Sequence, residues 1–107
     1  MKYKVFLIAD AEEDIFEIYN YVAKHDSPGK ADKLFENIQM TCLSLESFPE
    51  RGHTPPELER INLIGFFEIH YKPYRIIYQI LNNEVYIHFV LDGRRELQEL
   101  LEKRLLR

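Results

Sequence analysis

The sequence predicts an α+β domain with the element order β-α-α-β-β-β-α. In this fold a helical hairpin packs on a mainly antiparallel four-stranded sheet, and a C-terminal helix closes the chain. Three observations predict it: two strand-like runs flank Asn82-Asn83, two amphipathic helical patterns follow one another between residues 10 and 47, and leucines recur at helical spacing after residue 94. A length of 107 residues supports one core, so residues 1–107 are expected to form a single domain.

The N-terminal segment, Lys2 to Ile8, is predicted to be a strand because its apolar residues alternate loosely. Its apolar run, Val5 to Ala9, is too short for the hydrophobic region of a signal peptide or for a membrane span. No membrane partner is therefore expected.

The first helix is predicted to begin at Asp10, which has the spacing of a capping box with Glu13. Acidic residues 12–14 are expected to be solvated in the first turn, where the helix dipole favours them. The apolar face follows at helical spacing: Ile15, Ile18, Tyr19 and Val22.

A break at residues 25–29 separates the two helices. Ser27 is a predicted N-cap, with Pro28 at the first helical position. The second helix is predicted to run to about Ser47, with the apolar stripe Leu34, Ile38, Cys42 and Leu45. Cys42 is the one cysteine, so it is expected to be a small core residue in a reducing cytoplasm.

The C-terminal half is predicted to begin with an ordered proline-rich loop over residues 48–56. Three strands and a helix should follow, at Phe66 to Tyr71, Tyr74 to Leu81, Glu84 to Leu91 and Arg94 to Arg107. Asn82-Asn83 tolerates the positive φ of a tight hairpin turn. The economical arrangement is a three-stranded meander that the first strand joins.

Charge is distributed unevenly along the chain. The net charge of −4 argues against bulk nucleic-acid binding. Residues 1–50 hold five lysines and ten acids (−5), whereas residues 51–107 hold nine basic and eight acidic residues (+1). All seven arginines lie at or beyond Arg51, and arginine suits bidentate recognition of carboxylate or phosphate.

Arg75, Arg94 and Arg95 are expected to gather at one end of the sheet, and two interpretations of them stay open. They can bind a target: Arg94 and Arg95 would lie at the positive end of a helix dipole, where cations are disfavoured, and residues placed against local preference are candidates for function. Alternatively they form ion pairs that tie the sheet to the last helix, Arg75 with Glu68 and the other two with Asp92 or Glu96.

Other groups that can carry chemistry also have two interpretations. His70 is a candidate base, because histidine side chains ordinarily exchange protons near neutral pH. Alternatively, it is a histidine at a polar strand edge. The strand tyrosines can stack on RNA bases or pack against cross-strand neighbours: Tyr71, Tyr74, Tyr78 and Tyr86. No spacing of histidines or carboxylates predicts a metal site, and no cofactor is expected.

Five segments in this order resemble the RelE/ParE superfamily of toxins from bacterial type II toxin–antitoxin modules, nearer to the ParE (plasmid stabilisation) branch. They are AEEDIFEIYNYVA, SPGKADKLFENI, LESFPERGHTPPEL, KPYRIIYQI and VLDGRRELQELLEKRLLR. The resemblance implies the fold described above, growth inhibition, and a cognate antitoxin that wraps the toxin, in a homodimer or a heterotetramer with it. An apolar strip between the last helix and the sheet is the expected place for an antitoxin helix.

The superfamily divides by target, so the resemblance implies two functions. ParE-like members inhibit DNA gyrase by binding it, and Arg75, Arg94 and Arg95 would then contact the target. RelE-like members cleave mRNA on the ribosome, and His70 would act as base beside the same arginines. Departures from the RNase pattern favour protein binding: Phe67, Glu68 and His70 replace basic strand residues, and Leu100 and Leu101 replace an aromatic or histidine. A non-toxic binding protein with this fold is a third alternative.

Overall fold

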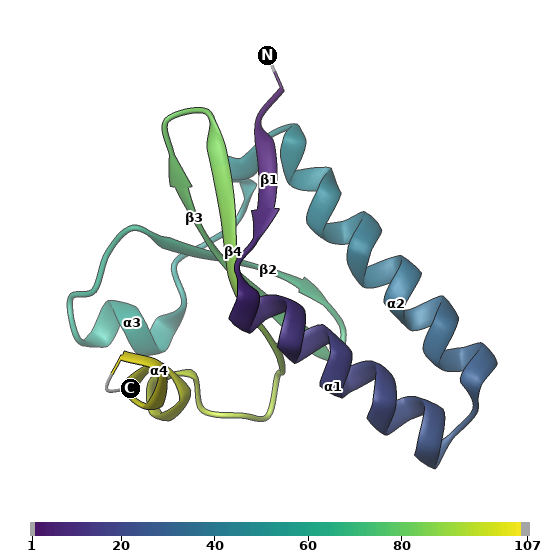
Figure 1. The fold of residues 1–107 in the computed structure, drawn as a ribbon. Coiled ribbons are helices and arrows are strands. Elements are labelled where there is room, and N and C mark those ends of the chain that lie inside the picture. Colours follow the sequence, from purple (N-terminus) through teal and green to yellow (C-terminus); the bar gives the residue numbers. More distant parts are fainter. Residues whose placement is uncertain (1, 106–107) are drawn as a thin grey trace.

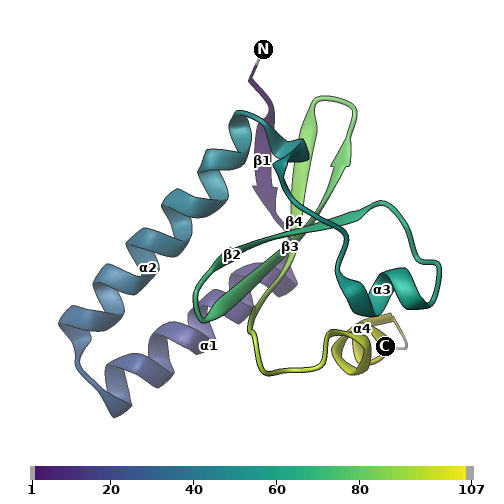
Figure 2. The same cartoon turned by 180° about the vertical axis from the view of Figure 1, so that it is seen from behind.

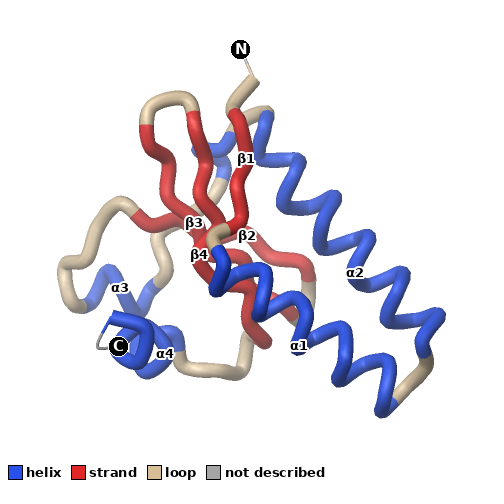
Figure 3. The backbone as a smooth tube through the Cα atoms, viewed as in Figure 1, coloured by secondary structure: helices blue, strands red, loops and turns tan. Residues whose placement is uncertain are grey.

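The computed structural model describes residues 2–105, which form four helices and four strands (Figures 1 and 3). In chain order they are β1 (Lys4–Leu7), α1 (Ala9–His25), α2 (Pro28–Leu43), α3 (Pro56–Arg60), β2 (Phe66–Tyr71), β3 (Tyr74–Leu81), β4 (Glu84–Asp92) and α4 (Leu97–Leu105). Two short 3-10 turns, Ser44–Glu46 and Pro49–Arg51, lie between α2 and α3. Within this part of the chain, each helix is too short or too polar to cross a lipid bilayer.

The four strands form one sheet in the order β1-β4-β3-β2. The meander β2-β3-β4 is antiparallel, and its second turn holds Asn82 at a φ of 57°. β1 pairs in parallel with β4, Lys4 opposite Glu84 and Leu7 opposite Ile87. The predicted fold class is therefore confirmed, with a mixed sheet whose one parallel pair joins the first strand of the chain, β1, to the last strand of the meander, β4.

The helical hairpin of α1 and α2 covers one face of the sheet (Figure 1). Apolar side chains from both helices and from that face form the main core: Ala11, Ile15, Ile38, Cys42, Leu45, Ile69, Ile76, Tyr78, Val85, Ile87 and Val90. Cys42 is 1% exposed, as predicted, and burial raises the pKa of its thiol to about 12. The thiol is therefore protonated and unreactive at neutral pH.

The short helices α3 and α4 pack together on the other side of the sheet (Figure 2). Their apolar residues and the strand residues beneath them form a second core: Leu58, Ile77, Phe89, Leu91, Leu97 and Leu101. Four consecutive residues of β3, Arg75 to Tyr78, are buried. A strand with such a run is covered on both faces. Where α3 and α4 pack on it, the sheet is therefore the middle layer of three.

The two predicted helix starts have different outcomes. Ser27 is the N-cap of α2, and its hydroxyl accepts a hydrogen bond from the backbone N–H of Lys30 at 3.1 Å, as predicted. The predicted capping box of Asp10 and Glu13 is wrong, because α1 begins at Ala9 with Ile8 at its N-cap. Ile8 donates its N–H to the Ile87 carbonyl at 3.1 Å, so pairing with β4 fixes the start of the helix.

Several boundaries also differ from the prediction. α2 ends at Leu43, and a 3-10 turn carries the chain on to Glu46. α4 begins at Leu97 because the Asp92 carboxylate accepts the Arg94 N–H at 2.9 Å, which holds the preceding residues in a turn. α3 follows directly on the proline-rich loop, and no sequence pattern predicted it.

Candidate functional site

A cleft of about 570 Å³ lies between β2, α3 and the turn before α4. Its lining contains several of the predicted site residues together with others from the 53–60 segment: His53, Pro56, Glu57, Arg60, Glu68, His70, Lys72, Pro73, Arg75, Gly93, Arg95 and Glu96. The structure thus brings His70, Arg75 and Arg95 together. Arg94 lies outside this cleft, in a neighbouring pocket with Tyr21 and Tyr74.

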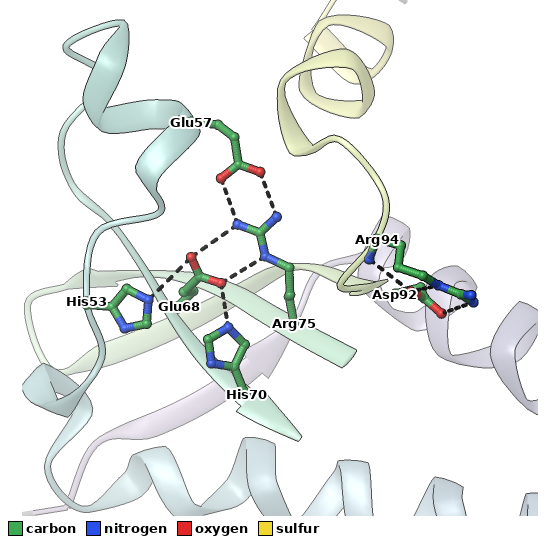
Figure 4. Close-up of polar contacts among 7 residues, drawn as sticks. All are labelled: His53, Glu57, Glu68, His70, Arg75, Asp92 and Arg94. Carbon is green, nitrogen blue, oxygen red and sulfur yellow. Dashed lines mark hydrogen bonds and ion pairs between the residues drawn. The ribbon is translucent and has the colours of Figure 1, made fainter. Parts of the chain in front are cut away.

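Arg75 is held between two carboxylates (Figure 4). Its Nη1 and Nη2 donate to Glu57 Oε2 and Oε1 at 2.6 and 2.8 Å. Its Nε and Nη2 donate to Glu68 Oε1 and Oε2 at 2.9 and 3.1 Å. The ion-pair interpretation of Arg75 with Glu68 is confirmed, and Glu57 from α3 is a second partner that the sequence did not reveal.

The electrostatics of this triad follow from its burial and geometry. Arg75 is 8% exposed and Glu68 is 2% exposed. Hydrogen bonds from Arg75 lower the pKa of Glu57 to about 2, and hydrogen bonds to both carboxylates raise the pKa of Arg75. Such bidentate pairs are among the strongest side-chain contacts, so the triad joins β2, β3 and α3 into one rigid unit.

Two histidines face the buried Glu68 carboxylate from different elements. His70, on β2, has its Nε2 2.9 Å from Glu68 Oε1. His53, in the proline-rich segment, has its Nε2 3.5 Å from Glu68 Oε2. The backbones of His53 and Glu68 exchange two hydrogen bonds of 3.2 and 2.7 Å, which fix the segment to β2. His53 and Glu68 are fifteen positions apart in the sequence, so no local motif marked His53.

Arg94 and Arg95 occupy the turn that precedes α4. The Arg94 side chain is 90% exposed, and its Nε donates to Asp92 Oδ1 at 3.1 Å. Hydrogen bonds from Arg94 lower the pKa of Asp92. Arg95 is exposed at the rim of the cleft. Both guanidinium groups are therefore accessible to a partner, whereas that of Arg75 is not.

The remaining RNase positions carry little suitable chemistry. The resemblance implies an aromatic residue or a histidine near Leu101. Leu101 is instead 6% exposed in the second core, and Leu100 packs against the same cluster. Tyr78 is fully buried and donates to the Pro49 carbonyl at 2.5 Å, and the Tyr71 hydroxyl accepts from Asn37 at 2.9 Å. These contacts favour the packing interpretation of the two tyrosines over base stacking.

A second candidate site is an apolar groove of about 810 Å³ on the helical hairpin. Residues of both helices and the end of β1 line it: Leu7, Ala9, Glu12, Glu13, Ile15, Phe16, Tyr19, Asp32, Phe35, Gln39, Cys42 and Leu43. Three large apolar side chains there remain exposed, Phe16 at 60%, Phe35 at 42% and Leu43 at 45%. The strip expected beside the last helix is instead filled by α4 itself, whose Leu97 and Leu101 are buried.

Comparison with solved structures identifies the architecture. A chain from the chromosomal ParDE toxin–antitoxin system of P. aeruginosa is 17% identical and superposes with a TM-score of 0.72, over 85% of this chain and 96% of that one. A chain from the RelBE2 toxin–antitoxin complex of Mycobacterium tuberculosis is 20% identical with a TM-score of 0.64, over 86% and 99%. At these identities the likeness concerns the fold. No curated protein matches the sequence.

The family assignment rests on the sequence itself. The family model described as the ParE toxin of the type II toxin–antitoxin system parDE matches residues 5–97. That span runs from β1 to the first residue of α4 and includes both candidate sites. The chain therefore belongs to the ParE toxin family of type II toxin–antitoxin systems.

Proposed function

We propose that this toxin acts by binding a protein target, DNA gyrase, and not by cutting RNA. The observation that carries the proposal is the engagement of Arg75 by Glu57 and Glu68. Stabilising the charge that develops on a cleaved phosphate requires donors that are free to face it. Here a phosphate would have to displace two carboxylates and then lie beside them, which is electrostatically unfavourable.

The target-binding surface we propose is the turn before α4. Arg94 and Arg95 are exposed there and can meet carboxylates of a protein surface. Arg75 supports the surface from within, since its ion pairs join α3 to the sheet on which α4 rests. The same residues, with His70, would carry the alternative function of a ribosome-dependent endoribonuclease.

The antitoxin, we propose, occupies the groove on the helical hairpin. The exposed Phe16, Phe35 and Leu43 can receive the apolar face of an amphipathic helix. Glu12, Glu13 and Asp32 line the same groove, so the matching helix should carry basic residues beside its apolar stripe. Toxin and antitoxin would assemble in the cytoplasm, as a heterotetramer if the toxin also pairs with itself.

Gyrase supercoiling assays test the target. The wild-type chain should inhibit supercoiling, and an Arg94→Ala/Arg95→Ala double variant should need at least about tenfold more protein for the same inhibition, a loss of about 1.4 kcal/mol. Lys33→Ala, which removes an exposed cation from α2, is the control and should inhibit normally. Supercoiling that stays intact at saturating toxin, together with mRNA cleavage on the ribosome that His70→Ala abolishes, would establish the endoribonuclease alternative instead. Induced expression without growth arrest would indicate a non-toxic binding protein.

Binding of the protein encoded by the adjacent small reading frame tests the groove. Phe16→Glu should weaken that binding at least about tenfold, because a large exposed aromatic in an apolar groove is a typical binding hot spot. Phe48→Glu is the matched control, since Phe48 is 79% exposed and lies outside the groove. Equal affinity of the two variants would contradict the assignment of the groove.

A further inference from the structure

We propose that His53, Glu68 and His70 form a binding site for a divalent transition-metal ion, with zinc as the ion to test first. One nitrogen from each ring and one carboxylate oxygen lie within 4.8 Å of one another. Both rings point toward the same carboxylate from separate elements (Figure 4). Two imidazoles and one carboxylate are a donor set that suits zinc, and three protein ligands leave one coordination position open to the cleft.

The charges in the ion-paired triad at Glu68 favour a cation, and Arg60, Lys72 and Arg95 line the same cleft more than 4.0 Å from this carboxylate. Arg75 contributes one positive charge, whereas Glu57 and Glu68 contribute two negative charges. Among the described residues, Arg75 is the one lysine or arginine with a nitrogen within 4.0 Å of the Glu68 carboxylate. Glu68 is 2% exposed, so water compensates its charge poorly. A dication held between the two histidines would place positive charge directly beside this buried carboxylate.

The hydrogen bonds of Glu68 leave room for such an ion. Each carboxylate oxygen can accept two contacts, and Arg75 supplies one to each. The second contact of Oε1 is with His70, and Oε2 faces His53. A metal ion would therefore replace the imidazole contacts and leave those of Arg75 in place. Glu57 holds Arg75 in place from the other side. Arg75 in turn keeps the Glu68 carboxylate oriented toward the two imidazole rings, as hydrogen-bonding groups behind metal ligands typically do.

The geometry needs only a small adjustment to reach coordination. Tetrahedral zinc with ligands at about 2.0–2.1 Å requires ligand atoms about 3.3 Å apart. The His53 and His70 side chains are 60% and 42% exposed, and their ring centroids are 5.5 Å apart at 47°. Rotation of two partly solvated rings can close the gap, because the backbone pairing of His53 with Glu68 already fixes both chains.

Titration calorimetry with zinc chloride on the full-length chain, first dialysed against EDTA, tests the proposal. We expect one equivalent of zinc to bind with a Kd of about 100 μM or tighter. His53→Ala and His70→Ala should each weaken binding at least about tenfold, and the double variant should bind no zinc in the same range. Cobalt chloride should give the visible absorption of four-coordinate cobalt with the wild type and not with the double variant.

His25→Ala is the matched control, because His25 is an exposed histidine at the end of α1 and should not affect zinc binding. Both ligand histidines are exposed, so the double variant should fold normally, and zinc should raise the melting temperature of the wild type but not of the double variant. Zinc binding weaker than about 100 μM, or equally tight in the double variant, would overturn the proposal.

Discussion

At the scale of single residues, Arg75 explains most of the candidate site. In the hairpin of β2 and β3, His70 lies opposite Arg75, and Glu68 lies two residues earlier on the same face. The sequence could therefore predict the pairing of Glu68 with Arg75 from hairpin geometry alone. Glu57 and His53 reach this ion pair through a proline-rich segment whose path depends on tertiary packing. No periodic pattern in the sequence therefore predicts their positions.

The Glu57–Arg75 contact predicts how stability depends on pH. The folded-state pKa of Glu57, about 2, is below the ordinary value of 4.5. The contact therefore contributes stability above about pH 4.5, and this contribution disappears as the pH falls toward 2. We expect it to be worth about 2 kcal/mol at neutral pH, because one pKa unit corresponds to about 1.4 kcal/mol and solvent at this partly exposed carboxylate screens part of the interaction.

Urea unfolding of the wild type and of Glu57→Gln between pH 2 and pH 7 measures this contribution. The wild type should be more stable at pH 7, and the difference should close by about pH 2. Effects of carboxylates that do not contact Arg75 are common to both proteins and cancel in the difference. A gap that stays constant over this range would mean that the ionised carboxylate of Glu57 contributes nothing.

At the scale of elements, local patterns predicted what each segment becomes better than where it begins or ends. Ser27 caps α2 because its hydroxyl accepts the Lys30 N–H, which has no partner within the helix. The start of α1 was not predictable from Asp10, because strand pairing of Ile8 fixes it. The predicted solvation of Asp14 is also wrong. This residue is 8% exposed, and its Oδ2 accepts the Val90 N–H at 3.0 Å.

Gly52, between the 3-10 turn at Pro49–Arg51 and His53, gives a prediction about the packing of this segment. A Cβ on Gly52 would lie 2.3 Å from the Tyr78 hydroxyl oxygen and 2.8 Å from the Glu68 carbonyl oxygen. Tyr78 cannot move aside, because it is fully buried and bonded to the Pro49 carbonyl. We expect Gly52→Ala to reduce the free energy of unfolding by about 1–3 kcal/mol, as overpacking typically does.

Gly29→Ala is the matched control for this measurement by urea unfolding. Gly29 is in the first turn of α2, and a Cβ there would meet no atom within 4 Å. Alanine favours a helix over glycine by up to about 1 kcal/mol, so this variant should be as stable as the wild type or more so. If Gly52→Ala changed the free energy of unfolding as little as Gly29→Ala does, the close packing of this turn would be unimportant for stability.

At the scale of the whole molecule, the sheet separates two cores that a few polar contacts join. The sequence predicted the helical hairpin on one face, because its two stripes are long and periodic. It did not predict the second core, since α3 is five residues long and its single buried side chain, Leu58, has no repeating pattern. Long elements thus carry their own signal, whereas short ones depend on neighbours distant in sequence.

Arg104 connects the two sides and gives the last prediction. Its guanidinium group, on α4, forms an ion pair with Asp14 of α1 and donates to the His88 carbonyl at 2.8 Å. It also lies 4.4 Å from the ring centroid of Phe89. Arg104→Gln should cost about 3 kcal/mol of unfolding free energy at pH 7, because it leaves a buried carboxylate without its counter-ion. Lys103→Gln, at the exposed neighbouring position, should cost far less.

The pH dependence of this loss distinguishes it from simple loss of packing. Burial raises the pKa of Asp14, and hydrogen bonding and attraction by Arg104 oppose that shift. Without Arg104 the folded-state pKa of Asp14 rises further, so the folded protein binds a proton that the unfolded chain releases. The stability deficit of Arg104→Gln should therefore shrink as the pH falls through this raised pKa toward 4. Urea unfolding at pH 7 and pH 4 measures it, and a deficit equal at both values would show that Arg104 stabilises α4 by packing on Phe89 alone.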